Sequence, residues 1–174
     1  MEIQEIWVEQ AMKGDLNAFS QIYECIYRDM YRYAYFMLGK VQDAEDTVSE
    51  AVMDIFTGLR QLRNIAAFKG WAFTILSNKC RKVRKQYLQK NLSLDDEEAM
   101  PPLQDKERDL EQHLDIEKAL KQLSDEVREV ILLSVIGGYS SDEIGEILSI
   151  KPSTARSKRK RSLEKIKKGL EIRY

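Results

Sequence analysis

The sequence predicts an all-helical protein made of two small domains. No segment alternates apolar and polar residues for long enough to indicate a strand, and apolar residues instead recur at helical spacing. Only three prolines occur among the 174 residues, and Pro101 and Pro102 stand together in an acidic stretch. We therefore expect one domain over residues 1–90, a flexible acidic linker over residues 91–108 and a second domain over residues 109–174.

The charged residues are segregated along the chain, although the formal net charge is only −1. Residues 79–90 are rich in lysine and arginine and contain no acid, whereas residues 95–117 are strongly acidic. Residues 151–168 are basic again, with Glu164 as the single acid among them. Two basic clusters separated by an acidic stretch indicate two contacts with a polyanion.

Several classes of protein are disfavoured by what the sequence lacks. Cys25 and Cys80 have neither metal-ligand nor redox spacing, and two cysteines make no disulfide framework. No apolar run is long enough to span a membrane, and the first residues do not form a signal peptide. His113, the single histidine, lies in a polar segment with no partner motif. We expect a cytoplasmic protein with no metal, no cofactor and no membrane insertion.

Four helices are expected in the first domain, because apolar residues recur every three or four positions between turn residues. Asp15 is expected to cap the second of them, which ends near Gly39, and a loop over residues 60–66 precedes the fourth. The four helices are expected over residues 3–14, 16–39, 43–58 and 67–90.

The third helix has two sharply different sides. Its apolar side, expected to face the core, consists of Ala44, Val48, Ala51, Val52 and Ile55. The other side carries a row of carboxylates that we call the acidic ridge, made of Asp43, Asp46, Glu50 and Asp54. The row is also compatible with ordinary surface charge and with Asp43 as a helix cap. A metal site or acid–base catalysis would need ligands from a second element, and all these acids lie on one helix.

The second domain is expected to begin with two helices. The leucines of the first are Leu110, Leu114, Leu120 and Leu123. Ser124 is expected to cap the next helix, which stops at Gly137 and Gly138.

The C-terminal region predicts a helix-turn-helix. Ser140 and Glu143 have capping-box spacing, in which each side chain bonds the backbone N–H of the other residue. Gly145 leaves room for a crossing helix, and Pro152 suits the first turn of the next helix, where a missing N–H is harmless. The second helix of such a motif can enter a DNA major groove.

The two sides of that second helix differ in charge. The side expected to face the core consists of Ala155, Ser162, Leu163, Ile166 and Leu170. The opposite side and its flanks consist of Ser153, Thr154, Arg156, Ser157, Lys158, Lys160 and Arg161. An amphipathic helix with a solvated basic side is the plain alternative. The capped helix that precedes it favours DNA binding.

The order of these features resembles the extracytoplasmic-function group of bacterial RNA polymerase sigma factors. The likeness extends from Ala18 to Lys168. The motifs that carry it are Asp43-Ala44-Glu45-Asp46 followed by Glu50, Phe68-Lys69-Gly70-Trp71 leading into Asn78, and the helix-turn-helix. Each motif alone is weak, but their order and spacing together are specific.

The resemblance implies three binding surfaces. Docking on the clamp coiled coil of core RNA polymerase would involve Asp43, Glu45, Asp46, Glu50 and Asp54. Engagement of the promoter −10 element, with capture of an unstacked base, would involve Arg63, Asn64, Asn78, Lys79 and Lys82. Reading of the −35 element would involve Ser153, Thr154, Arg156, Ser157, Lys160 and Arg161.

The sequence departs from the family pattern in places. Arg159 falls on the side of the helix that is expected to be buried, where its stem could pack while the guanidinium reaches solvent. Ser149 stands where a turn glycine is usual, which weakens the turn if that position needs a positive φ. The resemblance implies that Trp71, with Phe68 and Ile75 beside it, is a buried packing residue and not a base-stacking one.

The resemblance implies an alternative sigma factor that directs core RNA polymerase to a restricted set of promoters and is not an enzyme. Its expected partners are core RNA polymerase, promoter DNA and an anti-sigma factor, which commonly holds members of the group inactive. Two other functions stay open. One is a stand-alone helix-turn-helix regulator that binds a palindromic operator as a dimer, and the other is a nuclease that uses the carboxylate row.

Overall fold

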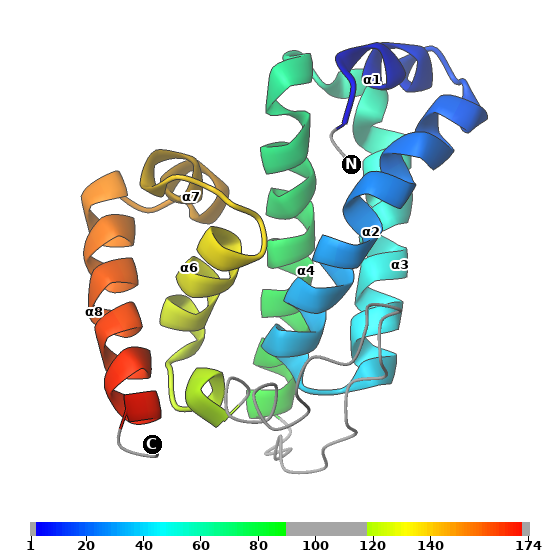
Figure 1. The fold of residues 1–174 in the computed structure, drawn as a ribbon. Helices are drawn as coiled ribbons and strands as arrows, with labels where there is room; N and C mark the ends of the chain where they lie inside the picture. The colour runs from blue at the N-terminus through cyan, green and yellow to red at the C-terminus, as the bar shows by residue number, and fades with distance from the viewer. Residues whose placement is uncertain (1–2, 90–117, 172–174) are drawn as a thin grey trace. The chain divides into compact units, whose positions relative to one another are not determined.

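The computed structural model describes residues 3–89 and 118–171, with side chains described as far as Lys167. These residues are helical and contain no strand, which confirms the predicted all-helical fold (Figure 1). The chain divides into two compact units, Met1–Asp96 and Glu97–Tyr174. The predicted linker over residues 91–108 and most of the helix predicted between Leu110 and Leu123 lie outside the described residues, so the linker bounds stay a prediction.

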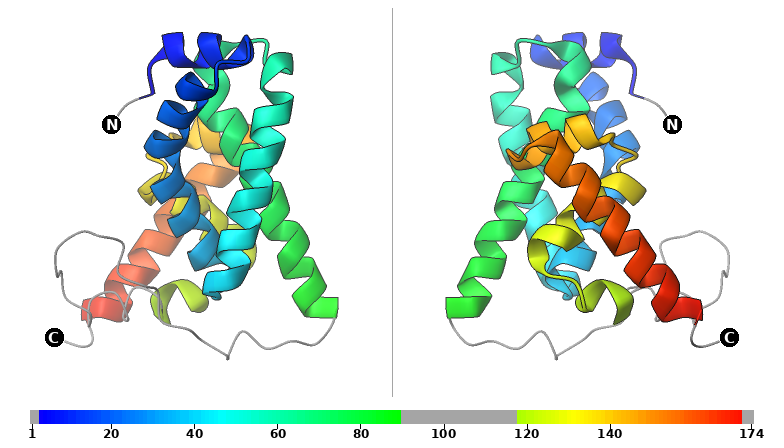
Figure 2. Two further views of the ribbon diagram at one scale, coloured as in Figure 1. Left: turned by 90° about the vertical axis from the view of Figure 1, so that its right-hand side faces the viewer. Right: turned by 90° about the vertical axis from the view of Figure 1, so that its left-hand side faces the viewer.

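The first unit is a bundle of three long helices with a short helix across one end (Figures 1 and 2). Its elements are α1 (Glu5–Met12), α2 (Leu16–Leu38), α3 (Val41–Gly58) and α4 (Phe68–Gln89), with 3-10 turns at Leu59–Gln61 and Ile65–Ala67. Each of α2, α3 and α4 packs against the other two, and consecutive helices run in opposite directions. α1 packs on α2 beside the two 3-10 turns.

Local sequence signals set most helix ends in this unit. The Asp15 side chain accepts hydrogen bonds from the backbone N–H groups of Asn17 (2.9 Å) and Ala18 (3.2 Å), so the predicted cap is confirmed. Gly39 ends α2 in the left-handed conformation, with φ of 76°. α3 then begins at Val41, two residues earlier than predicted, and the interpretation of Asp43 as its cap is wrong. The chain enters the helix directly after one extended residue at position 40.

The apolar side of α3 meets the core as predicted, with one difference. Ala44, Val48, Ala51 and Ile55 are buried, whereas Val52 is half-buried. The largest fully buried side chains of the unit come from every long helix: Ile22, Met30, Tyr33, Met37, Leu38, Ile55, Leu59, Phe68, Phe73 and Leu76. Burial of each such side chain contributes about 1.5–3 kcal/mol, so this core holds α3 in place with its acids turned outward.

The second unit contains a helical segment at residues 118–121, then α6 (Asp125–Val135), α7 (Ser141–Leu148) and α8 (Pro152–Glu171). α8 packs against both α6 and α7. Its core includes Val130, Leu133, Ile144, Ile147 and Ala155. Ser124 occupies the cap position of α6 as predicted, but its side chain makes no capping hydrogen bond.

A buried arginine joins α6 to the segment that precedes it. Arg128 donates from Nε to the carbonyl of Leu120 (3.0 Å) and from Nη2 to the carbonyls of Lys121 (3.3 Å) and Leu123 (3.1 Å). Carbonyls at a helix C-terminus lack partners within the helix, and Arg128 supplies them. No sequence pattern used above identified this role.

The core of the first unit can be tested on α3 itself. We expect Ile55→Ala to lower the free energy of unfolding by about 2–5 kcal/mol, because it leaves a cavity at a fully buried position. The matched change Met53→Ala removes a side chain that is 63% exposed on the same helix, and should alter stability by less than about 0.5 kcal/mol. Urea unfolding followed by circular dichroism measures both, and equal losses would contradict the burial pattern.

Candidate functional site

The acidic ridge forms as predicted on the outer side of α3, but its members differ in surroundings. Asp46, Glu50 and Asp54 are exposed, and Asp43 is half-buried. Glu45, which was assigned to the same surface, lies on the other flank of the helix. There its carboxylate adds to the effect of burial in raising the pKa of Tyr31. The five predicted docking residues therefore do not share one face.

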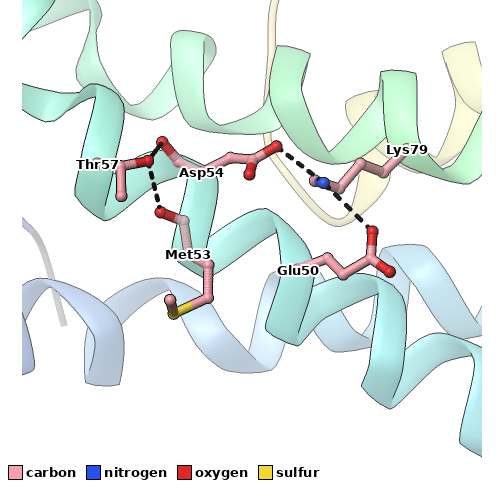
Figure 3. A network of polar contacts seen from close by, with 5 residues as sticks. All are labelled: Glu50, Met53, Asp54, Thr57 and Lys79. Carbon is pink, nitrogen blue, oxygen red and sulfur yellow. Dashed lines mark hydrogen bonds and ion pairs between the residues drawn. The ribbon is translucent and has the colours of Figure 1, made fainter.

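Lys79 of α4 reaches across to the acidic ridge (Figure 3). Its Nζ lies 2.8 Å from Oδ2 of Asp54 and 3.3 Å from Oε2 of Glu50. The hydrogen bond to Asp54 raises the pKa of Lys79, and the one to Glu50 raises it further against the opposing effect of burial. Lys79 was assigned to the −10 element, and a contact between its ammonium and a DNA phosphate would require these ion pairs to open.

A second link joins α3 and α4 at the far end of the ridge. The Tyr87 hydroxyl donates a hydrogen bond to Oδ2 of Asp43. Burial raises the pKa of Tyr87, and the Asp43 carboxylate raises it further, so the hydroxyl keeps the proton that it donates. The Lys40 ammonium lies 5.9 Å from the centre of the Tyr87 ring, within cation–π range. The antiparallel helices α3 and α4 are therefore linked at two positions, by Asp54 with Lys79 and by Asp43 with Tyr87.

Sequence reasoning missed both links between α3 and α4. A usable signal existed: Lys79 and Tyr87 are eight residues apart on the fourth helix, and Asp43 and Asp54 are eleven apart on the third. Two neighbouring antiparallel helices can bring such positions within reach of long side chains, because the spacings are similar at about 1.5 Å per residue. Knowing that these helices are neighbours requires the fold, which periodicity alone does not supply.

The residues assigned to the −10 element fall into two groups. Arg63 and Asn64 are exposed between the two 3-10 turns, and Asn64 accepts a hydrogen bond from the Ala66 backbone N–H (3.1 Å). Asn78 and Lys82 are exposed further along α4. Since α4 begins at Phe68, Asn78 lies about 15 Å along its axis. The two groups therefore lie at separate places on the first unit.

The packing prediction for Trp71 holds only in part. Its ring lies 6.1 Å from that of Phe68, and its edge packs 3.2 Å from where a Cβ on Gly58 would stand. Trp71 is half-buried, so it joins the end of α3 to the start of α4 at the edge of the core.

The helix-turn-helix of α7 and α8 has the predicted local geometry. Ser140 and Glu143 form the capping box, with the Ser140 N–H donating to Glu143 Oε2 at 2.8 Å and the Glu143 N–H donating to Ser140 Oγ at 3.3 Å. A Cβ on Gly145 would stand 2.8 Å from the carbonyl oxygen of Ile150 and 3.3 Å from Pro152. The turn and the start of α8 thus approach as closely as Gly145 permits.

The outer side of α8 carries the predicted residues. Ser153, Arg156, Ser157, Lys160 and Arg161 are exposed, and Thr154 is half-buried. The flanking Lys158 forms an ion pair with Glu126 of α6, so its ammonium is directed toward the unit and not outward. The exposed residues occupy the N-terminal half of α8, which is the half that a recognition helix presents to a major groove.

The inner side of α8 is narrower than predicted. Ala155 and Ser162 are buried, but Leu163 is 41% exposed, so its assignment to the core is wrong. Leu163 lies about 80° around the helix from Ala155, at the edge of the stripe that meets α6 and α7. Arg159 lies on the stripe and is half-buried there. The helix therefore accommodates the arginine while the neighbouring leucine faces outward.

The described residues contain no group of three or more His, Cys, Asp or Glu side chains placed to hold a metal ion. None of their helices is both long enough and apolar enough to cross a bilayer.

Comparison with known proteins identifies both units. Residues 22–89 match the family described as Sigma-70 region 2, and residues 113–166 match the family described as Sigma-70, region 4. These matches place the chain in the sigma-70 class.

Individual relatives identify the group within the sigma-70 class to which the chain is similar. The chain is 31% identical to the ECF RNA polymerase sigma factor SigW of Bacillus subtilis (strain 168), over 94% of each chain. It is 25% identical to the ECF RNA polymerase sigma factor SigM of Mycobacterium tuberculosis, over 83% of this chain and 73% of that protein. The sigma factor RpoE from Bartonella quintana, solved with the anti-sigma factor NepR, is 25% identical, with a TM-score of 0.74 over 90% of this chain and 99% of that one.

The chain belongs to the ECF RNA polymerase sigma factors. It is an alternative sigma factor that acts in transcription initiation, as the motif order predicted. The similarity covers both units, so a stand-alone helix-turn-helix regulator has no support from these comparisons.

The turn of the helix-turn-helix yields a stability test. Ser149 adopts a φ of 55°, which costs a side-chain-bearing residue more than it costs glycine. We expect Ser149→Gly to raise the free energy of unfolding of the second unit by about 0.5–1 kcal/mol. Ser140→Ala should lower it by about 1 kcal/mol through loss of the cap. Thermal denaturation distinguishes the two, and a less stable Ser149→Gly would contradict the strain argument.

Proposed function

We propose that the chain divides promoter recognition among three surfaces. The acidic ridge of α3 docks on core RNA polymerase, the 62–67 loop and α4 engage the −10 element, and α8 reads the −35 element. The observation that supports this division is the placement of exposed acids on α3 and of exposed cations on α4 and α8. On this proposal the protein works in the cytoplasm and catalyses no reaction itself.

The docking surface is centred on Asp46. Asp46 is exposed on the outer side of α3 with no described ion pair, whereas Glu50 and Asp54 already share the Lys79 ammonium. Both of these carboxylates stay largely accessible, at 70% and 57% exposure. A basic polymerase surface would be attracted to all three, and such complementarity sets orientation and the rate of encounter.

At the −10 element, Asn78 is proposed to read a base edge. Its amide is exposed on α4 and accepts a hydrogen bond from Arg81 at 3.4 Å, which helps to fix its orientation. An amide offers both donors and an acceptor, which suits the edge of an unstacked base. Lys82 is exposed three residues further on and is suited to a backbone phosphate.

At the −35 element, the exposed N-terminal half of α8 is proposed to enter the major groove. Arg156 has a planar fork of donors that matches the O6 and N7 acceptors of guanine. The Ser157 hydroxyl donates to the carbonyl of Thr154 (3.0 Å), so toward DNA it is left as an acceptor. Lys160 and Arg161 extend the basic surface along the helix.

An anti-sigma factor is proposed as a further partner. The support is the similarity to RpoE from Bartonella quintana, which was solved with its anti-sigma factor NepR.

The function is tested by transcription with purified components. We expect the chain, added to core RNA polymerase and genomic DNA, to produce RNA from a restricted set of start sites. Mapping of those starts would give the promoter sequence. Failure to start RNA at any genomic site would overturn the proposed function.

The docking surface is tested by charge reversal. Asp46→Lys with Glu50→Lys should weaken binding to core polymerase by at least about a hundredfold, because attraction to a basic surface becomes repulsion. Glu5→Lys with Glu9→Lys makes the same charge change on exposed positions of α1 and should bind normally. Fluorescence anisotropy with purified core polymerase measures both, and holoenzyme formation by the α3 variant at wild-type affinity would refute the assignment.

The −35 surface is tested by base selectivity. Arg156→Ala should cost about 1–3 kcal/mol of promoter binding and relax the preference at one −35 position, because it removes a bidentate base contact. Lys165→Ala, at an exposed position further along α8, should leave the base preference unchanged. Holoenzyme binding to a set of promoter variants provides the measurement. A loss equal across all sequences would make Arg156 a phosphate contact instead.

A further inference from the structure

Lys79 stands at the boundary between the two surfaces of the first unit. It follows Asn78 directly and precedes Lys82 by three positions, and both of these exposed residues belong to the proposed DNA surface. Its own ammonium lies between the carboxylates of Glu50 and Asp54 on α3 (Figure 3). One cation thus connects the acidic ridge to the helix proposed to bind DNA.

The three side chains differ in exposure, and the difference decides which of them a partner can reach. The Lys79 side chain is only 19% exposed, whereas Glu50 and Asp54 are mostly open to solvent. A basic partner can therefore approach both carboxylates without first displacing the lysine. Once there, it repels the ammonium and weakens the attraction of the two carboxylates for it. Partly exposed ion pairs of this kind are weak, so they exchange readily.

We infer that Lys79 couples partner docking to DNA binding: Glu50 and Asp54 hold its ammonium in the free chain, and a basic partner on those carboxylates releases it to a DNA phosphate. The inference rests on the proposed functions of the acidic ridge and of α4. The flexible four-carbon stem of lysine allows its ammonium to serve either side from one backbone position.

Coupling of this kind acts in both directions. If docking on the acidic ridge strengthens the hold of α4 on DNA by some factor, DNA must strengthen docking by the same factor. The free chain would bind DNA with one cation fewer than the complex does. Lys79 is thus a positioning residue for assembly on the promoter and not simply one more phosphate contact.

The experiment frees the Lys79 ammonium from Glu50 and Asp54 by substitution, with no partner present, and tests whether DNA binding then becomes tighter. Glu50→Gln with Asp54→Asn in the full-length chain removes both acceptor charges but keeps the shapes of the side chains. The matched control, Glu45→Gln with Asp46→Asn, makes the same change in net charge at exposed positions of the same helix. Binding of each free chain to a fluorescent oligothymidylate strand is measured by anisotropy over a range of salt concentrations.

We expect the Glu50 and Asp54 variant to bind the strand about three- to tenfold more tightly than the control pair at low salt. Its plot of log affinity against log salt should also be steeper by about 0.7, the value for one additional phosphate contact on a single strand. Adding Lys79→Gln should abolish the excess, and adding Lys79→Arg should preserve it. Asp54→Asn alone, which removes the nearer carboxylate, should give part of the effect.

Two results would overturn the coupling: equal tightening by the two neutralised pairs, or an excess that persists with Lys79→Gln. Thermal melts establish that each variant is folded. Failure of the proposed function is a separate outcome, because it appears as absence of RNA synthesis by the wild-type chain with core polymerase. If wild-type transcription proceeds and the excess is missing, the coupling alone is wrong.

Discussion

The antiparallel contact between α3 and α4 holds the first unit together and also positions its charges. Ala44 and Ala51 are buried on the inner side of α3, and α3 packs against α4. Across this contact Lys79 reaches Asp54, and Tyr87 reaches Asp43. The same packing that buries the core therefore brings opposite charges together along the edge of the interface. Part of the charge of the acidic ridge is in this way paired within the protein.

In the second unit, the turn between α7 and α8 positions the charged side of α8. Gly145 lets the backbone at Ile150 pass within contact distance, and Ser149 accepts a left-handed conformation to bring α8 back across α7. These two residues set the direction in which the exposed side of α8 points. Lys158 then ties α8 to α6 through Glu126, which leaves Arg156 and Lys160 on the open side.

Local signals were predictable from the sequence, and contacts between elements were not. The Asp15 cap, the end of α2 at Gly39 and the capping box of Ser140 depend on neighbours within four residues, so sequence alone identifies them. The partners of Lys79 lie more than twenty positions away, and the exposure of Leu163 depends on how wide a stripe α6 and α7 cover. The family resemblance assigned the binding surfaces to regions of the chain, and those assignments stay predictions. It did not reveal that Lys79 faces the acids of α3.

The role of Arg128 depends on the shape of its donor group as well as on its charge. Its guanidinium is buried and serves three carbonyl oxygens from two of its nitrogens. Lysine has the same charge, but its single ammonium is a compact point without the planar fork that reaches several acceptors at once. A lysine at this position would therefore leave some of these carbonyl oxygens without a donor, and the segment before α6 would lose part of its attachment to that helix although the charge is unchanged.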